Sequence, residues 1–374
     1  MKKDWSIGLM TGTVNDGNID IAALRTDGEE IFEFGPYELV PYQNKNIRHI
    51  IFETYDEAKN WGFIGKEPKI FSKLENLITV EQSNAVNTFL EKHNISKNQI
   101  LSVGFHGQTV LHHPPKNKKL KGMTRQLGDG KLMSKLLNLP VVYDFRTNDV
   151  AHGGQGAPLA PIYHSALSKK INNYPTVFLN IGGVANITYI GNKDTLIAFD
   201  TGPGNAPIDD FVKIKKSGEM DRNGNFAKLG KVNTKLVKEF MMNNYFDKPY
   251  PKSLDRNDFN FEKFNNLELE DGCASLTKII ASTISRALKL LPQKPLQIIV
   301  SGGGRNNPII MNEIKNETQT ECIKVEDIGF RGDAIEAEAF AFLAVRSLKN
   351  YPLSYPLTTG ISNPITGGKI VFPN

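Results

Sequence analysis

Short apolar stretches alternate along the chain with longer segments of helical periodicity. This alternation is typical of layered α/β proteins rather than of barrels built from hairpins. The predicted strands occupy residues 6–10, 19–24, 30–34, 100–105, 139–143, 176–181, 187–190, 195–199 and 296–300, and the predicted helices occupy residues 129–137, 234–243, 272–291 and 334–347. Three short strands in succession open the chain, and three more begin at residue 176. The pattern therefore predicts duplicated mixed sheets flanked by helices.

The chain is longer than one hydrophobic core comfortably supports. With 374 residues, we expect two lobes and a central cleft in which a small-molecule enzyme would work. Gly153, Gly154 and Gly156 interrupt both the strand and the helix periodicity, which indicates a boundary near residue 150. We expect a first lobe of residues 1–150, completed by residues 348–374, and a second lobe of residues 151–347.

The composition narrows the class of protein. Hydrophobic residues make up 40% of the chain and charged residues 23%, without a long polar tract, as in globular enzymes. No apolar run reaches membrane-spanning length, and the start of the chain lacks the pattern of a cleaved leader. We therefore expect a cytoplasmic protein that does not bind a membrane. With only Cys273 and Cys322, the chain lacks a disulfide framework and a four-cysteine metal site, and both thiols are expected to be buried.

The positive charge is modest and scattered. The formal net charge is +5, and the densest group of lysines follows a pair of prolines at residues 116–121. Binding of nucleic acid would need aromatic platforms or a groove-binding motif beside these lysines, and neither is present. This segment is therefore expected to be a solvated loop, and nucleic acid is not an expected partner.

Three glycine-rich loops are candidates for nucleotide binding. Residues 8–20 and 179–188 each form a strand, a glycine-containing turn and a second strand, and backbone amides in such turns can point at a phosphate. Either turn alone is compatible with an ordinary hairpin, but their repetition in both halves favours phosphate binding. A third cluster at residues 301–307 would let a base and ribose approach the backbone. The spacings of the P-loop and of the dinucleotide-binding loop are absent, so another design is expected.

Several segments together make the sequence recognisable. They are residues 8–20, 104–109, 144–151, 153–159, 179–187, 199–205, 221–224, 252–253, 301–306 and 336–344. Over nearly its whole length the chain resembles the anhydro-N-acetylmuramic acid kinase family, within the superfamily that contains actin and hexokinase. The segments FDTGPGN at 199–205 and GGQGAPL at 153–159 are the most specific. The chain departs from the usual pattern at Val14, Asn15 and the additional Asn18, and at residues 254–256, where Leu-Asp-Arg replaces Thr-Gly-Arg.

The resemblance implies a fold, an activity and partners. The fold would be the two-lobed, actin-like ATPase fold of ribonuclease H-like sheets. The protein would use ATP, Mg²⁺ and water to open a 1,6-anhydro-sugar from cell-wall turnover and phosphorylate it, and it would be a homodimer. The implied cofactor-binding residues are Gly12, Thr13, Asp16, Gly17, Asp20, Gly182, Gly183, Asn186, Gly302, Gly303 and Gly304. Asp16 and Asp20 would hold the metal through water, although each is also compatible with an ordinary turn carboxylate.

The chemistry requires a carboxylate that activates water. A 1,6-anhydro-sugar has no free 6-hydroxyl, so water must open the ring at the anomeric carbon, and a base must take its proton. Asp200 ends a predicted strand before a Gly-Pro-Gly turn, and by resemblance it is the catalytic base; the alternative is a carboxylate that caps the turn. By resemblance Glu336 is the second catalytic carboxylate, and the alternative is stabilisation of the helix N-terminus. Glu338 lies on another helical face, where we expect solvent or an interface.

Polar residues after two predicted strands are candidates for binding the sugar. His106, Gln108 and Thr109 would hydrogen-bond sugar hydroxyls, and Arg146 would pair with the lactyl carboxylate. Two further expected substrate-binding residues are Gly204 and Asn205. A buried His106 satisfied by the backbone, or an ion pair between Arg146 and Asp149, would give the same sequence pattern.

Three other functions compete with this hypothesis. A kinase for an ordinary hexose or amino sugar would deprotonate a free hydroxyl, but residues 153–159 and 199–205 argue against it. A catalytically silent sugar-binding regulator is disfavoured because Asp16, Asp200, Glu336 and all three glycine loops are retained. An actin-like ATPase that moves a protein partner would need an additional peptide-binding segment, for which this chain has no room.

Overall fold

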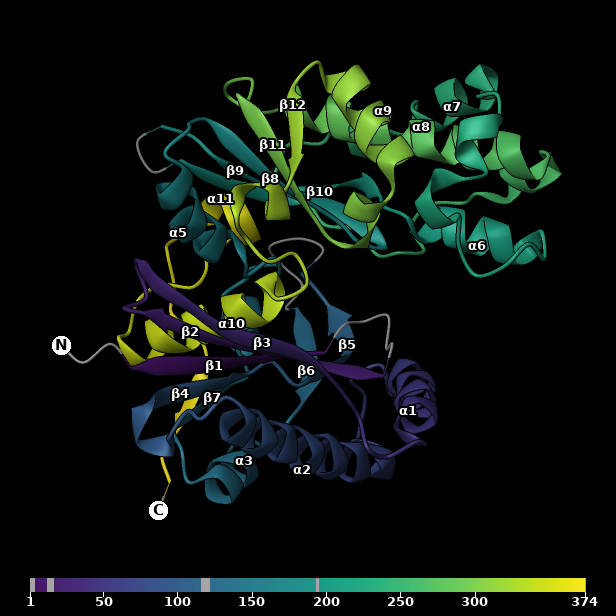
Figure 1. The fold of residues 1–374 in the computed structure, drawn as a ribbon. Coiled ribbons are helices and arrows are strands. Elements are labelled where there is room, and N and C mark those ends of the chain that lie inside the picture. The colour runs from purple at the N-terminus through teal and green to yellow at the C-terminus, as the bar shows by residue number, and fades with distance from the viewer. Residues whose placement is uncertain (1–3, 12–16, 116–121, 193–194, 374) are drawn as a thin grey trace. The chain divides into compact units, whose positions relative to one another are not determined.

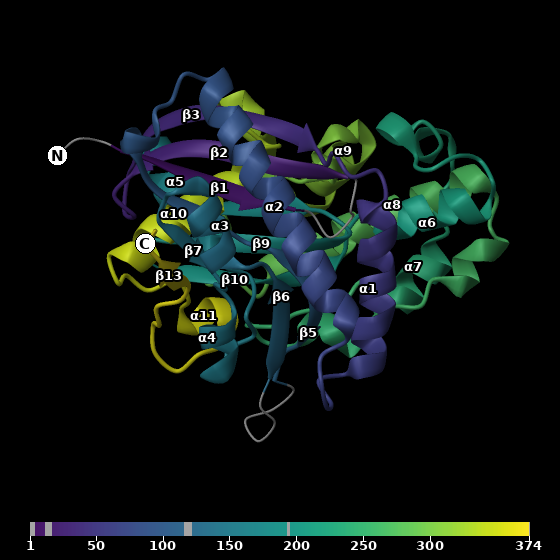
Figure 2. The same cartoon turned by 90° about the horizontal axis from the view of Figure 1, so that it is seen from below.

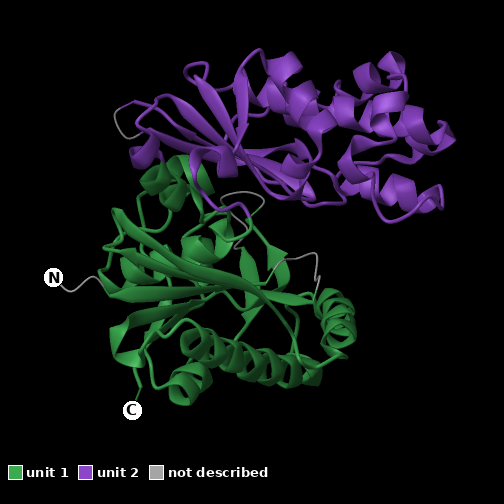
Figure 3. Ribbon diagram, viewed as in Figure 1, with its two compact units in different colours: residues 1–167, 333–374 green, residues 168–332 purple. Residues whose placement is uncertain are grey.

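The computed structural model describes residues 4–11, 17–115, 122–192 and 195–373 (Figure 1). The chain forms two compact units, residues 1–167 with 333–374 and residues 168–332 (Figure 3). The second unit begins at residue 168 and ends at residue 332, whereas we expected it to span residues 151–347. Residues 151–167 and 333–347 both belong to the first unit.

The first unit is built on a six-stranded mixed sheet in the order β13-β7-β4-β1-β2-β3. Its strands are β1 (Trp5–Met10), β2 (Asn18–Thr26), β3 (Ile31–Pro41), β4 (Ile100–Phe105), β7 (Val141–Tyr143) and β13 (Lys369–Val371). The first three strands form an antiparallel meander, β4 runs parallel to β1, and β7 runs parallel to β4. The C-terminal strand β13 pairs antiparallel with β7 and ends the sheet.

Helix α10 (Ile335–Leu348), which we expected in the second lobe, packs on the sheet of the first unit. The reason is steric complementarity. A Cβ atom on Gly8 would lie 1.8 Å from the carbonyl oxygen of Ala337, and one on Gly104 would lie 2.2 Å from that of Phe340. The two glycines thus let the helix backbone approach β1 and β4 directly, and the hydroxyl of Ser6 donates a hydrogen bond to the carbonyl oxygen of Ala341 at 2.9 Å.

Helices α2 (Lys69–Lys92) and α3 (Gly130–Leu137) cover the opposite face of this sheet. Figure 2 views that face, with α2 and α3 in front of the strands. Ile7 and Phe105 of the sheet share a buried cluster with Phe89 of α2 and Met133 of α3. The central strands β1 and β4 are therefore covered on both faces, as expected for strands with continuous apolar runs, whereas the edge strands β3 and β13 are mostly exposed or half-buried.

The second unit repeats this topology in a five-stranded sheet of order β10-β9-β8-β11-β12. Its strands are β8 (Thr176–Ile181), β9 (Val184–Ile190), β10 (Leu196–Pro203), β11 (Gln297–Ser301) and β12 (Glu321–Lys324). Again three antiparallel strands are followed by strands that run parallel to the first. Helices α8 (Leu269–Leu288) and α9 (Pro308–Thr318) contribute to its core. The predicted α/β fold with duplicated mixed sheets is confirmed.

Helix α7 (Thr234–Phe240) corresponds to the helix predicted at residues 234–243, but several other elements were not predicted from the sequence pattern. The remaining helices are α1 (Ile47–Trp61), α4 (Thr147–Ala151), α5 (Pro161–Ile171), α6 (Ala206–Ile214), α7 (Thr234–Phe240) and α11 (Pro356–Thr359), with 3-10 turns η1 (Lys97–Gln99), η2 (Arg222–Gly224), η3 (Ala227–Leu229), η4 (Asn244–Asp247), η5 (Glu262–Asn266), η6 (Gly303–Asn306) and η7 (Val325–Ile328). Strands β5 (Gln108–His113) and β6 (Met123–Leu127) form a separate hairpin. Of the two thiols, Cys273 is buried and Cys322 is partly buried.

Two expectations fall on residues outside the described part of the chain. These are the N-terminal turn at residues 12–16, which holds Gly12, Thr13 and Asp16, and the lysine-rich segment at residues 116–121. Within the described residues, no helix is both long and apolar enough to cross a membrane.

Candidate active site

Asp200 lies at an irregularity in strand β10. It pairs with Asn186 of β9, but the next register pair joins Gly202 to Ala185, so Thr201 is an additional residue in β10. Such a bulge redirects the side chains next to it, and bulges are common beside active sites. The hydroxyl of Thr201 donates a hydrogen bond to the carbonyl oxygen of Ala185 at 3.1 Å, which holds the irregularity in place.

Backbone and side-chain hydrogen bonds hold Asp200 at three points. Its amide donates to the carbonyl oxygen of Lys252 at 3.0 Å, and its carbonyl oxygen accepts from the hydroxyl of Tyr245 at 2.7 Å. In the carboxylate, Oδ2 accepts from the amide of Leu254 at 2.8 Å. Burial raises the pKa of Asp200 to about 7; the Leu254 amide opposes this rise, and the negative charge of Asp258 adds to it. A carboxylate with this pKa can act as a general base near neutral pH.

Three glycine-containing segments meet at one end of the second sheet. The turn between β8 and β9 contains Gly182 and Gly183, whose carbonyl oxygens accept from the amides of Asn205 and Gly204, respectively, at 2.9 Å each. A Cβ on Gly302 would lie 2.4 Å from Oδ1 of Asn180, the residue of β8 that pairs with Asn186. The sequence-predicted residues of these loops are therefore neighbours in space.

Hydrogen bonds from the Arg305 side chain stabilise the loop after β11. Its guanidinium donates to Glu326 at 2.9 Å and to the carbonyl oxygen of Gly302 at 3.0 Å, and Arg305 is 5% exposed. Nearby, Oδ1 of Asn205 is buried without a hydrogen-bond partner among the described residues. A buried acceptor of this kind is costly unless a ligand or water satisfies it. At Gly304 a Cβ atom would lie 2.3 Å from Cγ2 of Ile181, whereas at Gly303 the nearest atom would be Nδ2 of Asn205 at 4.0 Å, so of these glycines Gly303 leaves open space beside the backbone.

In the first unit, His106 and Arg146 form a direct pair. The guanidinium donates from Nη2 to Nε2 of His106 at 3.0 Å and from Nη1 to the carbonyl oxygen of Gly156 at 2.8 Å. Burial and the positive charge of Arg146 lower the pKa of His106 well below its usual value. The imidazole is therefore neutral with its proton on Nδ1, because Nε2 accepts from Arg146. This Nδ1 is buried and has no hydrogen-bond partner among the described residues.

The alternative in which Arg146 forms an ion pair with Asp149 does not match the hydrogen bonds. Asp149 is 1% exposed and accepts from the amide of Gly156 and from the hydroxyl of Thr359, each at 2.6 Å. It therefore holds the glycine-rich loop at 153–156, and this loop in turn presents the Gly156 carbonyl oxygen to Arg146. Burial lowers the pKa of Arg146 to about 10, and the charges of Glu336 and Asp149 oppose this decrease.

Gln108 and Thr109 begin strand β5. The Gln108 amide nitrogen donates to the hydroxyl of Tyr55 at 2.8 Å, while its Oε1 is buried without a partner in the described part of the chain. Thr109 pairs with Gln126 across the hairpin. The two residues that flank Gly107 in the sequence thus each have a buried atom without a hydrogen-bond partner among the described residues, Nδ1 of His106 and Oε1 of Gln108.

The two acidic residues at the start of α10 have different environments. Glu336 lies in the first turn of the helix; the surrounding protein atoms limit the solvation of its carboxylate and raise its pKa, and the positive charge of Arg146 opposes this rise. Glu338, which we expected in solvent or at an interface, is 1% exposed and accepts from the hydroxyl of Tyr163 at 2.5 Å. That expectation was wrong because α5 covers this face of the helix, which the sequence pattern of α10 alone does not reveal.

The described part of the first glycine-containing hairpin places Gly17 and Asp20 at its turn end. Asp20 pairs with Met10, the last residue of β1, and the carbonyl oxygen of Gly17 accepts from the amide of Tyr42 at 3.0 Å. Gly17 has a φ of 91°, which favours glycine. No group of three or more metal-ligating side chains occurs among the described residues.

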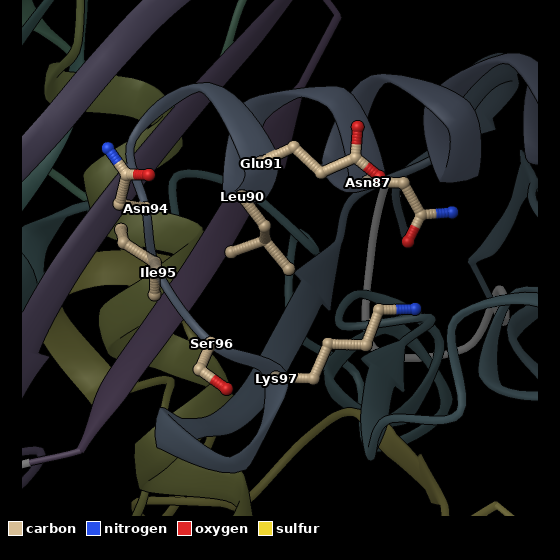
Figure 4. A pocket seen from close by; sticks show the side chains of 7 residues that line it. All are labelled: Asn87, Leu90, Glu91, Asn94, Ile95, Ser96 and Lys97. Atoms are coloured by element: carbon tan, nitrogen blue, oxygen red, sulfur yellow. The ribbon is translucent and has the colours of Figure 1, made fainter.

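A surface pocket at the end of α2 is separate from all these residues (Figure 4). It is lined by Asn87, Leu90, Glu91, Asn94, Ile95, Ser96 and Lys97. None of these is a sequence-predicted site residue, and the pocket contains no unsatisfied buried side chain among the described ones. We assign it no function.

Sequence reasoning missed the contacts made by Tyr245 and Lys252. Lys252 lies in a segment that carries the family resemblance, but the sequence analysis gave this residue no role. Tyr245 lies in an irregular polar segment and gave no signal. Their contacts with Asp200 depend on a long-range approach between β10 and residues 245–254.

Comparison with known proteins identifies the family. The profile of the family described as "Anhydro-N-acetylmuramic acid kinase" matches residues 4–373. Proteins of that name from Brucella anthropi and Mesorhizobium japonicum are 51% and 49% identical, over 99% of this chain and 100% of each relative. Among solved structures, component A of (R)-2-hydroxyglutaryl-CoA dehydratase from Acidaminococcus fermentans aligns at 12% identity with a TM-score of 0.45, over 91% of this chain and 99% of that one. On the sequence matches, this chain belongs to the anhydro-N-acetylmuramic acid kinase family.

Proposed function

We propose that this protein uses ATP and water to open 1,6-anhydro-N-acetylmuramic acid and phosphorylate its O6, giving N-acetylmuramic acid 6-phosphate during peptidoglycan recycling. The single observation that carries the mechanism is the environment of Asp200, a half-buried residue held by three hydrogen bonds, where burial raises the pKa of the carboxyl to about 7. Family membership supplies the substrate class. We further propose that the enzyme works in the cytoplasm as a homodimer.

Asp200 acts as the general base toward water. Its Oδ2 is occupied by the amide of Leu254, so Oδ1 is the oxygen assigned to accept the proton. Water then attacks the anomeric carbon, and the bond from this carbon to O6 breaks. The freed O6 attacks the γ-phosphate of ATP, the bond from the γ-phosphorus to the bridging oxygen breaks, and ADP leaves. The raised pKa brings the base closer to the operating pH, at which proton transfer is most effective.

The polar groups of the first unit bind the sugar. The Nδ1–H of His106 donates to a sugar oxygen, and Oε1 of Gln108 accepts from a sugar hydroxyl, because both atoms are buried and unsatisfied without a ligand. Arg146 pairs with the lactyl carboxylate through a guanidinium N–H outside its bonds to His106 and Gly156. Thr109 contributes a further hydroxyl, and Glu336 orients the water or the sugar.

The glycine loops of the second unit bind the nucleotide. The turn at Gly182 and Gly183 presents backbone amides to phosphate, the loop at 302–304 approaches the base and ribose, and the neighbouring Gly204 and Asn205 contact the reacting part of the substrate. When bound, ATP supplies the phosphoryl group and Mg²⁺ neutralises its developing charge. Asp20, at the turn end of its hairpin, has the oxygen ligand that Mg²⁺ prefers and would hold it through water, together with Asp16.

Isotope labelling tests this function. Purified protein is incubated with ATP, Mg²⁺ and 1,6-anhydro-N-acetylmuramic acid in ¹⁸O-water, and the product is analysed by mass spectrometry at early times, before the anomeric hydroxyl exchanges with solvent. We expect a 6-phosphate with the label at the anomeric carbon. Asp200→Asn is expected to abolish this product, whereas Glu219→Gln, which changes an exposed carboxylate paired with Lys213, should retain it.

The outcome also separates this function from its closest alternative. Turnover with a free hexose, but none with the anhydro-sugar, would identify an ordinary sugar kinase whose Asp200 deprotonates a hydroxyl. Nucleotide and sugar binding without turnover of either sugar would identify a silent regulator.

A further inference from the structure

The segment that holds Asp200 is itself organised around a buried lysine. Lys252 is 9% exposed, and its ammonium donates to the carbonyl oxygens of Tyr245 at 3.0 Å and Phe246 at 3.2 Å. The ammonium also lies 4.7 Å from the centre of the Tyr245 ring and 5.4 Å from that of Phe199. The lysine therefore ties turn η4 to the residue that directly precedes Asp200.

A buried ammonium held by neutral groups is costly. Burial lowers the pKa of Lys252 to about 8, a decrease that the charge of Asp247 opposes. Its two carbonyl acceptors and two aromatic rings offset part of the desolvation. A hydrophobic side chain would fill the same space without this cost. The presence of a charge here therefore points to a role for the hydrogen bonds that the ammonium makes.

The segment that Lys252 holds makes three hydrogen bonds to Asp200, which we call the clamp. The carbonyl oxygen of Lys252 accepts from the Asp200 amide, the hydroxyl of Tyr245 donates to the Asp200 carbonyl oxygen, and the amide of Leu254 donates to Oδ2. All three contacts come from residues 245–254. The ammonium of Lys252 fixes the two ends of this segment against each other.

We propose that Tyr245 and Lys252 are positioning residues that aim the Asp200 carboxylate, with Oδ2 held by the Leu254 amide and Oδ1 left to accept the proton of water. This inference rests on the proposed function of Asp200 as the base. Tyr245 and Lys252 act through the backbone of residues 200 and 254 and do not touch the reacting atoms.

Matched pairs of variants test the clamp. Tyr245→Phe removes the hydroxyl that bonds to Asp200, and Tyr250→Phe removes a hydroxyl of the same segment whose ring instead stacks on Phe199 at 5.5 Å. Lys252→Met removes the buried ammonium, and Lys238→Met removes an exposed one on α7. The measurements are kcat, KM for ATP and for the sugar, and the pH dependence of kcat/KM.

We expect Tyr245→Phe to lower kcat about tenfold, as for one lost hydrogen bond in an active site, with both KM values within about twofold of the wild type. Because a loosened Leu254 amide no longer opposes protonation of Asp200, the acidic limb of the pH profile should move to higher pH. Lys252→Met should show the same shift. The two control variants should match the wild type in kcat and in the position of the limb.

A Tyr245→Phe profile that coincides with that of Tyr250→Phe would overturn the proposal. So would a Lys252→Met variant that raises only KM for ATP without moving the limb, since it would place the ammonium on the nucleotide. If Lys252→Met does not fold, Tyr245→Phe alone decides.

A readout without turnover separates the clamp from the proposed function. Asp200→Asn is introduced into the wild type and into Tyr245→Phe, and its effect on the free energy of unfolding is measured by denaturation at several pH values. The pH dependence of this effect reports the pKa of Asp200 even in an inactive protein. An inactive wild type would refute the function, whereas an unchanged pH dependence in the Tyr245→Phe background would refute the clamp.

Discussion

Replacing Asp200, the proposed catalytic base, should make the protein more stable while it abolishes activity. The pKa of Asp200 is raised from 3.8 to about 7, mainly by burial, so ionisation of this group lowers the free energy of unfolding. Asn at this position is never ionised, and its carbonyl oxygen can still accept from the Leu254 amide. Asp200→Asn therefore removes a cost without removing the hydrogen bond.

The size and sign of the gain follow from the pKa difference. A difference of about three pH units at about 1.4 kcal/mol per unit gives an upper limit of roughly 4 kcal/mol. Since the residue is partly accessible to solvent, we expect about 2 kcal/mol. Below pH 3.8 both the folded and the unfolded chain are protonated and the variant gains nothing. As pH rises from 3.8 to about 7, the unfolded chain ionises first, so the wild type loses stability and the advantage of the variant grows.

Urea denaturation of both proteins at several values between pH 4.5 and pH 8 measures this difference. The exposed replacement Glu219→Gln serves as the control and should change the free energy of unfolding by less than about 0.5 kcal/mol. In the wild type, kcat/KM should also rise about tenfold between pH 6 and pH 8, as Asp200 loses its proton. An Asp200→Asn variant that is less stable than the wild type at pH 8, or whose difference is independent of pH, would refute the reasoning.

Three further predictions concern the first unit. Gly104→Ala places a Cβ 2.2 Å from the carbonyl oxygen of Phe340 and should lower the free energy of unfolding by about 1–3 kcal/mol in urea titrations; a wild-type midpoint would contradict the tight packing of α10 on the sheet. Tyr163→Phe removes the hydroxyl that donates to the buried Glu338 and should cost about 1 kcal/mol in the same assay, whereas an unchanged stability would show that this hydrogen bond is dispensable. Arg146→Ala should raise KM mainly for substrates with the lactyl group, by about tenfold or more, and an equal effect on an anhydro-sugar without that group would remove the assignment.

Local patterns were sufficient for much of the fold. The strands at 100–105 and 176–181 were predicted with the bounds they have in the structure, because each is a short apolar run flanked by polar or turn-forming residues. Helices α1 and α2 were missed, since long polar faces dilute their apolar periodicity. The hairpin of β5 and β6 was missed because residues of both strands are only partly buried.

The candidate site was also only partly accessible from the sequence. Asp200, Glu336, His106 and Arg146 were identified by motif and by resemblance, which depend on residue type and order. The neutral state of His106 follows instead from its burial and from its contact with Arg146, forty residues along the chain. No local pattern predicts such a contact.

The sequence by itself determined the alternation of strands and helices, the duplicated glycine loops and the family. Only the tertiary structure decided that α10 joins the first unit, that Glu338 is buried and that Tyr245 and Lys252 hold Asp200. The physical reason is that local pattern encodes which residues seek burial, but not which distant surface buries them. That choice depends on steric fit, such as the space above Gly8 and Gly104, and on hydrogen bonds between segments that are far apart in the chain.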